Sequence, residues 1–134
     1  MPDTFQLEIV TPEKMVVRDS AEEMQIPGKN GYLGILPGHA PLITELAVGE
    51  ITYSNKGEKH TLAVAWGFAE VLPEKVTILA ETCEHPDEID NKRAQDAKQR
   101  ADERLKSGSA EVDYPRAQAA LQRAETRIDV AGKK

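Results

Sequence analysis

Residues 76–94 read VTILAETCEHPDEIDNKRA, and the pattern of side chains changes within this stretch. Before Pro86, the run VTI alternates apolar and polar residues, which is the two-residue period of a half-buried strand. After Pro86, turn residues are rare, and Ala, Arg, Glu, Gln and Lys dominate, all of which favour helices. The sequence therefore predicts two modules, residues 1–86 and residues 87–134.

The first module shows the same alternation in other places. Apolar residues occupy every second position at Phe5, Leu7 and Ile9, and again at Leu62, Val64 and Trp66. Turn signals rich in Pro, Gly and Asn separate such runs about every ten residues, which is typical of an all-β sandwich or barrel. This spacing leaves no room for a long helix before Pro86.

The second module predicts two helices, over 87–106 and 113–131, with Asp87 and Asp113 as their N-terminal caps. One face of each helix is lined mainly by alanine. These faces hold Ala94, Ala97, Ala101 and Leu105 in the first helix and Ala117, Ala120, Ala124, Ile128 and Ala131 in the second. Joined by a short loop, they predict an antiparallel hairpin whose helix axes lie close together.

Charge also differs between the modules. Residues 1–86 carry 13 acidic and 6 basic residues, a net charge of −7, whereas residues 87–134 carry 10 acidic and 11 basic residues, a net charge of +1. A nucleic-acid reader would show a basic face, so we expect no nucleic-acid partner. No apolar run approaches the roughly 18 residues of a membrane-spanning helix, and any membrane link is therefore expected to go through a partner.

Arginines flank the alanine faces. They fall on one side of each helix, at Arg93 and Arg100 in the first and at Arg116, Arg123 and Arg127 in the second. Guanidinium groups that converge beside Asp90 and Glu84 would form an anion site, and their fork geometry suits phosphate. The other interpretation is a solvated stripe of scattered surface ion pairs, which contribute little to stability. Spacing alone leaves both interpretations open.

Five stretches together resemble one known family. They are GYLGILPGHAPLI at 31–43, GFAEV at 67–71, VTILAE at 76–81, IDNKRA at 89–94 and VDY at 112–114. In this order and spacing they are similar to motifs of the epsilon subunit of F-type, proton-translocating ATP synthase. The resemblance is to the bacterial type and covers essentially the whole chain.

This resemblance implies an α+β fold, with an antiparallel β-sandwich of about ten strands followed by an antiparallel two-helix hairpin. It implies a non-catalytic rotor subunit that binds the gamma subunit and the c-ring and couples proton-driven rotation to ATP synthesis. The hairpin would permit ATP hydrolysis when folded down and inhibit it when extended toward the alpha and beta subunits. The complex would place the chain peripherally on the cytoplasmic face of the bacterial inner membrane.

The resemblance also implies that ATP is a regulatory ligand, with no metal cofactor. The positions expected to contact ATP are Glu84, Asp90, Arg93, Ala94, Arg100, Arg123 and Arg127. The arginines would neutralise phosphates, and the small Ala94 would allow close approach. The two acidic residues would accept hydrogen bonds from the adenine amine or the ribose hydroxyls, or would orient an arginine.

In this family the loop region that matches residues 31–43 faces the c-ring, and Tyr32 and His39 are the contact residues expected here. Relatives often carry an acidic residue at the position of Tyr32, whereas tyrosine offers a hydroxyl and a flat apolar ring. The alternative for His39 is an imidazole that stabilises the turn. Pro37, Gly38 and the nearby glycines are expected to form tight turns, some with positive φ.

Two other functions compete with this interpretation. Cys83-Glu84-His85 could supply a nucleophile or half of a metal site, but one cysteine and three histidines provide no second ligand pair and no Ser-His-Asp set. We therefore expect no catalytic residues and no metal. The second alternative is a β-sandwich adaptor whose helical tail binds one partner helix without nucleotide.

Overall fold

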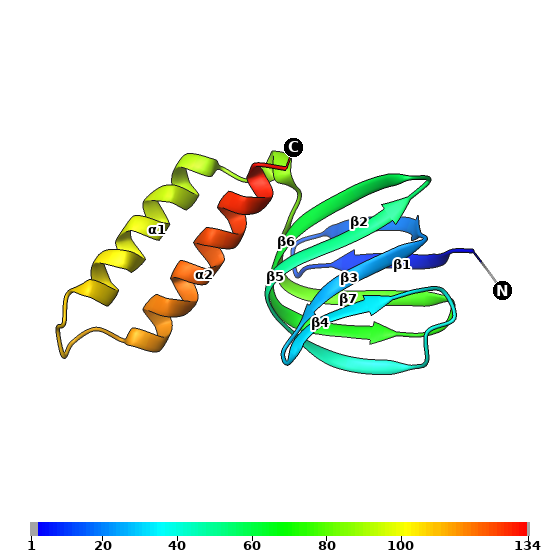
Figure 1. Cartoon of the computed structure of the whole chain (residues 1–134), viewed down its shortest axis with the longest axis horizontal. Coiled ribbons are helices and arrows are strands. Elements are labelled where there is room, and N and C mark those ends of the chain that lie inside the picture. Colours follow the sequence, from blue (N-terminus) through cyan, green and yellow to red (C-terminus); the bar gives the residue numbers. More distant parts are fainter. Residues whose placement is uncertain (1–2, 134) are drawn as a thin grey trace. The chain divides into compact units, whose positions relative to one another are not determined.

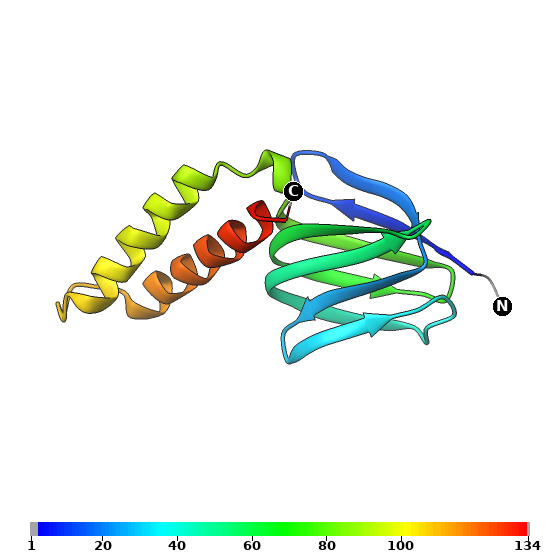
Figure 2. The ribbon, with the colours of Figure 1, turned by 45° about the horizontal axis from the view of Figure 1, so that its top comes forward.

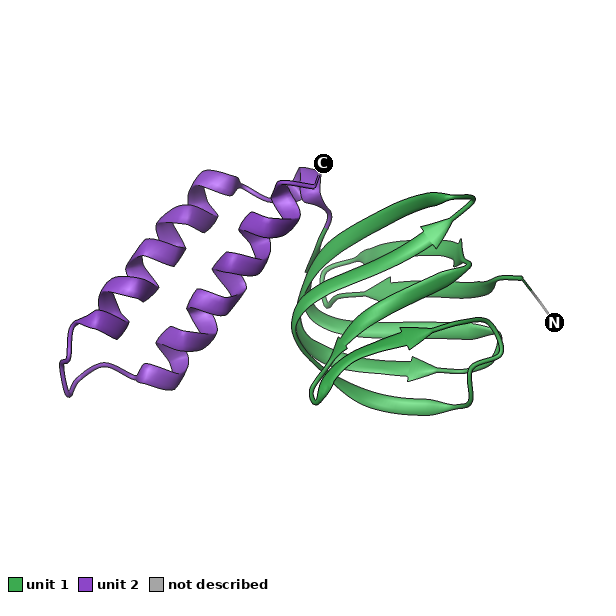
Figure 3. Cartoon of the chain, viewed as in Figure 1, with its two compact units in different colours: residues 1–84 green, residues 85–134 purple. Residues whose placement is uncertain are grey.

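The chain divides into a unit of strands, Met1–Glu84, and a unit of helices, His85–Lys134 (Figure 3). The structure is a computed structural model, and it describes residues 3–133. No helix within these residues combines the length and apolar character that crossing a membrane requires.

The first unit contains seven strands in one continuous sheet (Figure 1). They are β1 (Phe5–Val10), β2 (Met15–Ala21), β3 (Glu23–Gly28), β4 (Gly31–Ile35), β5 (Leu42–Asn55), β6 (Glu58–Val71) and β7 (Lys75–Glu84). Their order in the sheet is β2-β1-β7-β6-β5-β3-β4. All neighbours are antiparallel except β1 and β7, which are parallel, so the prediction of a wholly antiparallel sheet is wrong at that pair.

The sheet folds back on itself, which makes it a sandwich. Strands β2 and β3 are separated only by Glu22, yet β2 forms one edge of the sheet and β3 lies next to the other edge. The connection is possible because the edge at β2 comes up against β5. Glu22 N–H donates to the carbonyl of Ser54 at 2.8 Å, and Asn55 Nδ2 donates to Asp19 Oδ1 at 2.8 Å.

The core lies between the two layers of this folded sheet. Phe5, Leu7 and Ile9 are almost fully buried, as their alternation predicts. Leu62 and Val64 are also buried, but Trp66 is 37% exposed and is missing from the core cluster. The prediction that Trp66 shares the buried face of Leu62 and Val64 is therefore wrong, and a bend in the strand explains why.

The expectation of about ten strands is also wrong in number, because β5 and β6 each run for 14 residues and β7 for 10. Each long strand changes which side of it faces the core. The core residues change from Leu46 to Ile51 and Tyr53 in β5, from Leu62 and Val64 to Ala69 and Val71 in β6, and from Val76, Ile78 and Ala80 to Cys83 in β7. Even-numbered core positions thus give way to odd-numbered ones in all three strands.

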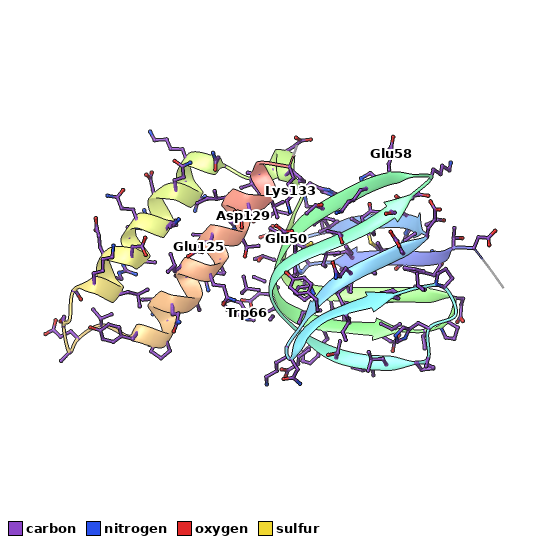
Figure 4. The ribbon with its side chains drawn as sticks, viewed as in Figure 1. Glu50, Glu58, Trp66, Glu125, Asp129 and Lys133 are labelled. Carbon is purple, nitrogen blue, oxygen red and sulfur yellow. The ribbon has the colours of Figure 1, made fainter. Side chains whose placement is uncertain are left out.

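The change of side happens at one place across the three strands. Gly67 pairs with Leu46 and with Ala80, and no register shift occurs there. Trp66 has φ 54° and Gly67 has φ 144°, both unusual in a strand. Trp66 lies at this bend and Glu58 at the end of the β5–β6 hairpin (Figure 4). The long strands therefore curve through both layers without breaking (Figure 2).

The second unit contains a short 3₁₀ turn, η1 (Pro86–Glu88), and the helices α1 (Asn91–Lys106) and α2 (Tyr114–Ala131). Asp113 caps α2, as predicted, by accepting from Arg116 N–H at 3.1 Å. The predicted cap at Asp87 is wrong. Pro86 starts η1 instead of α1, and extended backbone at Ile89 separates the two elements. Asp90 takes the capping role by accepting from Arg93 N–H at 3.0 Å.

The two helices pack against each other along alanines. Ala94 and Ala101 of α1 and Ala117 and Ala124 of α2 are all at most 4% exposed, and we call these four residues the alanine seam. Side chains this small let helix axes approach closely but bury little apolar area. The hairpin therefore depends on its caps as well as on its seam.

Candidate functional site

The alanine seam serves as a reference for the position of each arginine along the length of the hairpin. Its alanines are seven residues apart in each helix, a rise of about 10 Å. The chain turns between the helices, so the two alanines nearer the loop, Ala101 and Ala117, lie level with each other. Ala94 and Ala124 lie level with each other toward the open end.

Three of the four predicted arginines therefore gather at the open end of the hairpin. Arg93 is next to Ala94, Arg123 is next to Ala124, and Arg127 is one turn further along α2. Arg100 lies about two turns nearer the loop. Arg93 and Arg100 are exposed, whereas Arg123 and Arg127 are partly buried. Along the helix axis, Arg93 and Arg100 are therefore about 10 Å apart.

Asp90, Ala94 and Glu84 have different structural roles from the arginines. The carboxylate of Asp90 is already engaged as the cap of α1, and Ala94 is buried in the seam. Glu84 ends β7 and belongs to the unit of strands, whereas the other six predicted residues belong to the unit of helices. The helical unit by itself thus carries the four arginines, Asp90 and Ala94.

Two clefts lie elsewhere. One, of about 440 Å³, is on the sandwich and is lined by residues of β3, β4, β5 and β6 together with Leu36. The other, of about 360 Å³, is at the loop end of the hairpin between Arg104 and Arg116. None of the seven residues expected to contact ATP lines either cleft.

The predicted c-ring loop contains a tight turn at residues 36–39. His39 N–H donates to the carbonyl of Leu36 at 3.2 Å, and Gly38 has φ 84°, which favours glycine. Gly38 N–H donates to the carbonyl of Pro73 at 2.8 Å, which ties the turn to the β6–β7 connection. His39 Nδ1 lies 2.7 Å from the carbonyl of Ala40, so the imidazole takes part in the turn.

Tyr32 lies in strand β4 rather than in a loop, and its hydroxyl reaches β5. The register between β3 and β5 shifts after Gln25, so part of β5 lacks a regular ladder partner. There the Tyr32 hydroxyl accepts a hydrogen bond from Glu50 N–H at 3.0 Å. A Cβ atom on Gly49 would lie 2.6 Å from this hydroxyl, so the tyrosine fits because residue 49 is glycine. The side chain is nevertheless 53% exposed.

Sequence reasoning missed an apolar surface on the outer side of the long strands. Phe68 and Leu79 are paired neighbours on β6 and β7, and they are 53% and 56% exposed. Ile43 on β5 is 71% exposed and lies two residues from Glu45, the partner of Phe68. We call Ile43, Phe68 and Leu79 the outer apolar patch. Its signal in the sequence is an apolar residue at a position where strand alternation predicts a polar one.

Cys83, the candidate nucleophile, lies in the interior of the sandwich. Cys83 is 5% exposed and packs in the core of the sandwich. Within residues 3–133, no group of three or more His, Cys, Asp or Glu side chains is placed to hold a metal ion. Burial of the thiol makes a nucleophilic role for Cys83 physically unfavourable.

Two protein families match consecutive parts of the chain. The β-sandwich domain of the ATP synthase delta/epsilon chain matches residues 4–86. The long α-helix domain of the same chain matches residues 87–132. The two matches meet at the proline where the sequence pattern changes.

Curated relatives agree with these matches. The ATP synthase epsilon chain of Koribacter versatilis is 69% identical over 111 residues, which cover 83% of this chain and 78% of that one. The epsilon chain of Solibacter usitatus is 48% identical over 101 residues, 75% of each chain. The epsilon chain of Desulfosudis oleivorans is 49% identical over 109 residues, 81% of this chain and 82% of that one.

Solved structures show the same fold. A chain in the cryo-EM structure of the Euglena gracilis mitochondrial ATP synthase (OSCP/F1/c-ring) has a TM-score of 0.83 at 22% identity, covering 98% of this chain and 82% of that one. A chain of the central stalk/c-ring structure from Tetrahymena thermophila has a TM-score of 0.56 at 14% identity, covering 96% and 94%. From the two family matches and the identity to curated relatives, this chain belongs to the epsilon-chain family of bacterial F-type ATP synthase.

Proposed function

We propose that this protein is a rotor subunit of the central stalk, that its sandwich binds the gamma subunit and the c-ring, and that its hairpin inhibits ATP hydrolysis when ATP is scarce. The chain itself would catalyse no reaction; it would couple proton-driven rotation to ATP synthesis. It would lie peripherally on the cytoplasmic face of the inner membrane, held there by these partners.

The outer apolar patch is the observation that carries the rotor proposal. Three large side chains more than half exposed on adjacent strands are unusual for a surface that contacts only water. The strands beneath are held in register by backbone pairing, so the patch is rigid before it binds. A rigid apolar surface suits a stable subunit contact, and we assign it to the gamma subunit.

Charge around the patch defines what gamma must offer. Glu45 lies beside Phe68 in the same row, and Glu70 lies opposite Ile43 in the next. Both carboxylates are exposed, although Glu45 Oε2 also pairs with Lys29 Nζ at 3.1 Å. The partner surface is therefore expected to present apolar side chains bordered by lysine or arginine.

Gamma binding by variants of the patch tests this proposal. Covering a half-exposed Phe or Leu side chain contributes about 1 kcal/mol or more, so Phe68→Ser and Leu79→Ser should each raise the Kd for gamma about tenfold. Leu36→Ser is the matched control, because Leu36 is 60% exposed but lines the separate cleft on the sandwich. Unchanged affinity in both patch variants, with the fold intact, would contradict the assignment.

The c-ring contact is proposed for the region of Tyr32 and His39. Both side chains already make hydrogen bonds within the sandwich, so they would offer a fixed surface rather than flexible contacts. The polar loops of the c subunits would meet this surface. Alanine at Tyr32 is expected to weaken coupling of the assembled complex more than it weakens gamma binding.

The hairpin is proposed to sense ATP through its arginines. Arg93, Arg123 and Arg127 gather at one end of the hairpin, and Arg100 lies further along α1. The arginines flank a contact that buries little apolar area, so the seam alone holds the two helices together only weakly. A triphosphate would turn the arginines into charge-assisted hydrogen-bond donors that bridge α1 and α2.

The expected size of the effect is sufficient for a switch. A ligand that binds only the folded-down hairpin stabilises it by about 2.7 kcal/mol at a hundredfold excess over Kd. That shifts a balanced equilibrium by about two orders of magnitude. Abundant ATP would hold the hairpin down, and scarce ATP would release it toward the alpha and beta subunits.

Calorimetric titration of the whole chain with ATP tests the sensor. Arg123→Ala should weaken ATP binding sharply, because a guanidinium that bridges phosphate is lost. Lys98→Ala is the control, since residue 98 lies roughly 140° around α1 from Arg93. Equal affinity in the wild type and in Arg123→Ala would remove the sensor while leaving the rotor assignment intact.

The alternative function is a β-sandwich adaptor that binds one partner helix without nucleotide. Such an adaptor would also bind its partner through the outer apolar patch, but its arginines would bind no nucleotide. The two functions differ in one measurement, because an adaptor would show no heat of binding with ATP and would keep its affinity for gamma in all arginine variants.

A further inference from the structure

Asn30 and Gly31 form an Asn-Gly sequence in the tight turn that joins β3 to β4. The turn consists of Lys29 and Asn30, and Gly28 pairs with Gly31 across its base. Both turn residues and Gly31 are exposed to solvent. Within residues 3–133, the side-chain amide of Asn30 makes no hydrogen bond. The amide carbon of Asn30 is therefore held only by its own side-chain torsions.

Gly31 places no obstacle beside that amide. It has no side chain, its φ is 131°, and nothing lies within 4 Å of the point where a Cβ atom would be. A five-membered ring that included the nitrogen of Gly31 would meet no neighbouring atom on that side. Glycine also accepts backbone conformations that are closed to other residues.

We propose that Asn30 is a site of spontaneous deamidation, in which the protein reacts with itself and then with water. The backbone nitrogen of Gly31 attacks Cγ of Asn30, so a C–N bond forms and the bond from Cγ to Nδ2 breaks. Nδ2 leaves as ammonia and takes the proton that the backbone nitrogen loses. Water then opens the resulting succinimide at either carbonyl and gives aspartate or isoaspartate, with no change of oxidation state.

The other two asparagines of the chain lack these features. Asn55 also lies at a strand connection, but lysine follows it and its Nδ2 donates to Asp19 Oδ1 at 2.8 Å. Asn91 begins α1, where the backbone is helical, and lysine follows it too. The chain thus contains its own controls for the reaction.

The product would change the turn in two ways. Either product adds a carboxylate next to Lys29, whose Nζ pairs with Glu45 Oε2 at 3.1 Å, so Lys29 gains a second acidic partner. Isoaspartate also inserts a methylene group into the backbone of a two-residue turn, which alters the geometry at the base of β4. The charge and the backbone geometry of the turn would therefore change as the protein ages.

The experiment follows the amides of the folded, full-length chain over time in neutral and mildly alkaline buffer. Trypsin cuts after Lys29 and next after Lys56, so one peptide carries Asn30 at its start and Asn55 near its end. Fragment spectra of that peptide separate the two sites, and a sample digested at the start corrects for reaction during digestion. Asn30→Gln should abolish the product at this site.

The expected result is a growing fraction of aspartate and isoaspartate at position 30, faster at higher pH, while Asn55 and Asn91 keep their amides. A chain kept in denaturant gives the reference rate for an unstructured Asn-Gly sequence. Conversion in the folded protein at a comparable rate supports the proposal. Retention of the Asn30 amide in the folded protein while the denatured chain converts, or equal conversion at Asn55, would overturn it.

Discussion

At the scale of single residues, Gly67 has the least room for change. A Cβ atom there would lie 2.0 Å from the carbonyl oxygen of Leu79, and the φ of 144° disfavours any other residue. We expect Gly67→Ala to lower the free energy of unfolding by about 3 kcal/mol or more, because backbone strain and a clash with backbone act together. Urea denaturation measures this change.

Gly34 provides the comparison for that experiment. A Cβ atom on Gly34 would have nothing within 4 Å, and its φ lies outside the range that favours glycine. Gly34→Ala should therefore change stability by no more than about 0.5 kcal/mol. Equal losses in the two variants would mean that the bend at Gly67 tolerates a side chain.

Tyr53 gives the sandwich a dependence on alkaline pH. Burial raises the pKa of Tyr53 to about 12 from 10.0, and the charge and hydrogen bond of Asp19 add to the effect. The neutral phenol is favoured in the folded state, so its contribution is complete below pH 10 and is lost as pH rises through about 12. Denaturation at several pH values should show this loss in the wild type.

Two variants identify the group responsible. Tyr53→Phe should remove that part of the alkaline loss, whereas Tyr114→Phe should retain it, because Tyr114 lies in the hairpin and donates to the carbonyl of Ser109. An unchanged pH profile in Tyr53→Phe would assign the loss to other groups.

At the scale of elements, the alanine seam limits the size of residues between the helices. Ala124 is 2% exposed, and a leucine there should force the helices apart at a cost of about 1–3 kcal/mol. Circular dichroism should then show the helices melting at lower temperature than in the wild type. Gln122→Leu, at an exposed position of the same helix, should leave the melting of the helices nearly unchanged.

The strands and helices also show which features can be predicted from a few neighbouring residues and which cannot. The burial of Phe5, Leu7 and Ile9 and the cap at Asp113 follow from patterns of a few residues, and these were predictable. The cap of α1 was not, because a proline followed by acidic residues begins a 3₁₀ turn as readily as a helix. The side on which Trp66 lies depends on a bend whose only local sign is a glycine within a strand.

At the scale of the whole molecule, the sandwich core is complete without the hairpin. Every residue of its core cluster lies between Phe5 and Cys83. We therefore expect a fragment of residues 1–86 to fold cooperatively and to bind gamma. Its circular dichroism spectrum and thermal transition provide the measurement, and a fragment without a cooperative transition would contradict the independence of this unit.

The candidate sites show what sequence could not supply at this scale. The seven residues expected to contact ATP were assigned through the resemblance to a known family, and their role as ATP contacts stays a prediction. The outer apolar patch could not be located in that way, since Ile43, Phe68 and Leu79 become neighbours only through the pairing of three strands. Likewise, nothing local to Tyr32 indicates that its hydroxyl would serve the backbone of β5.

The bend at Gly67 has a mechanical consequence. In a sandwich of two separate sheets, side-chain packing alone opposes sliding of one layer over the other. Here β5, β6 and β7 pass from one layer into the other without interruption, so a twisting force applied to one layer is opposed by covalent backbone and by ladder hydrogen bonds. The sandwich should therefore behave under torque as a stiff body that deforms little and transmits most of the applied rotation.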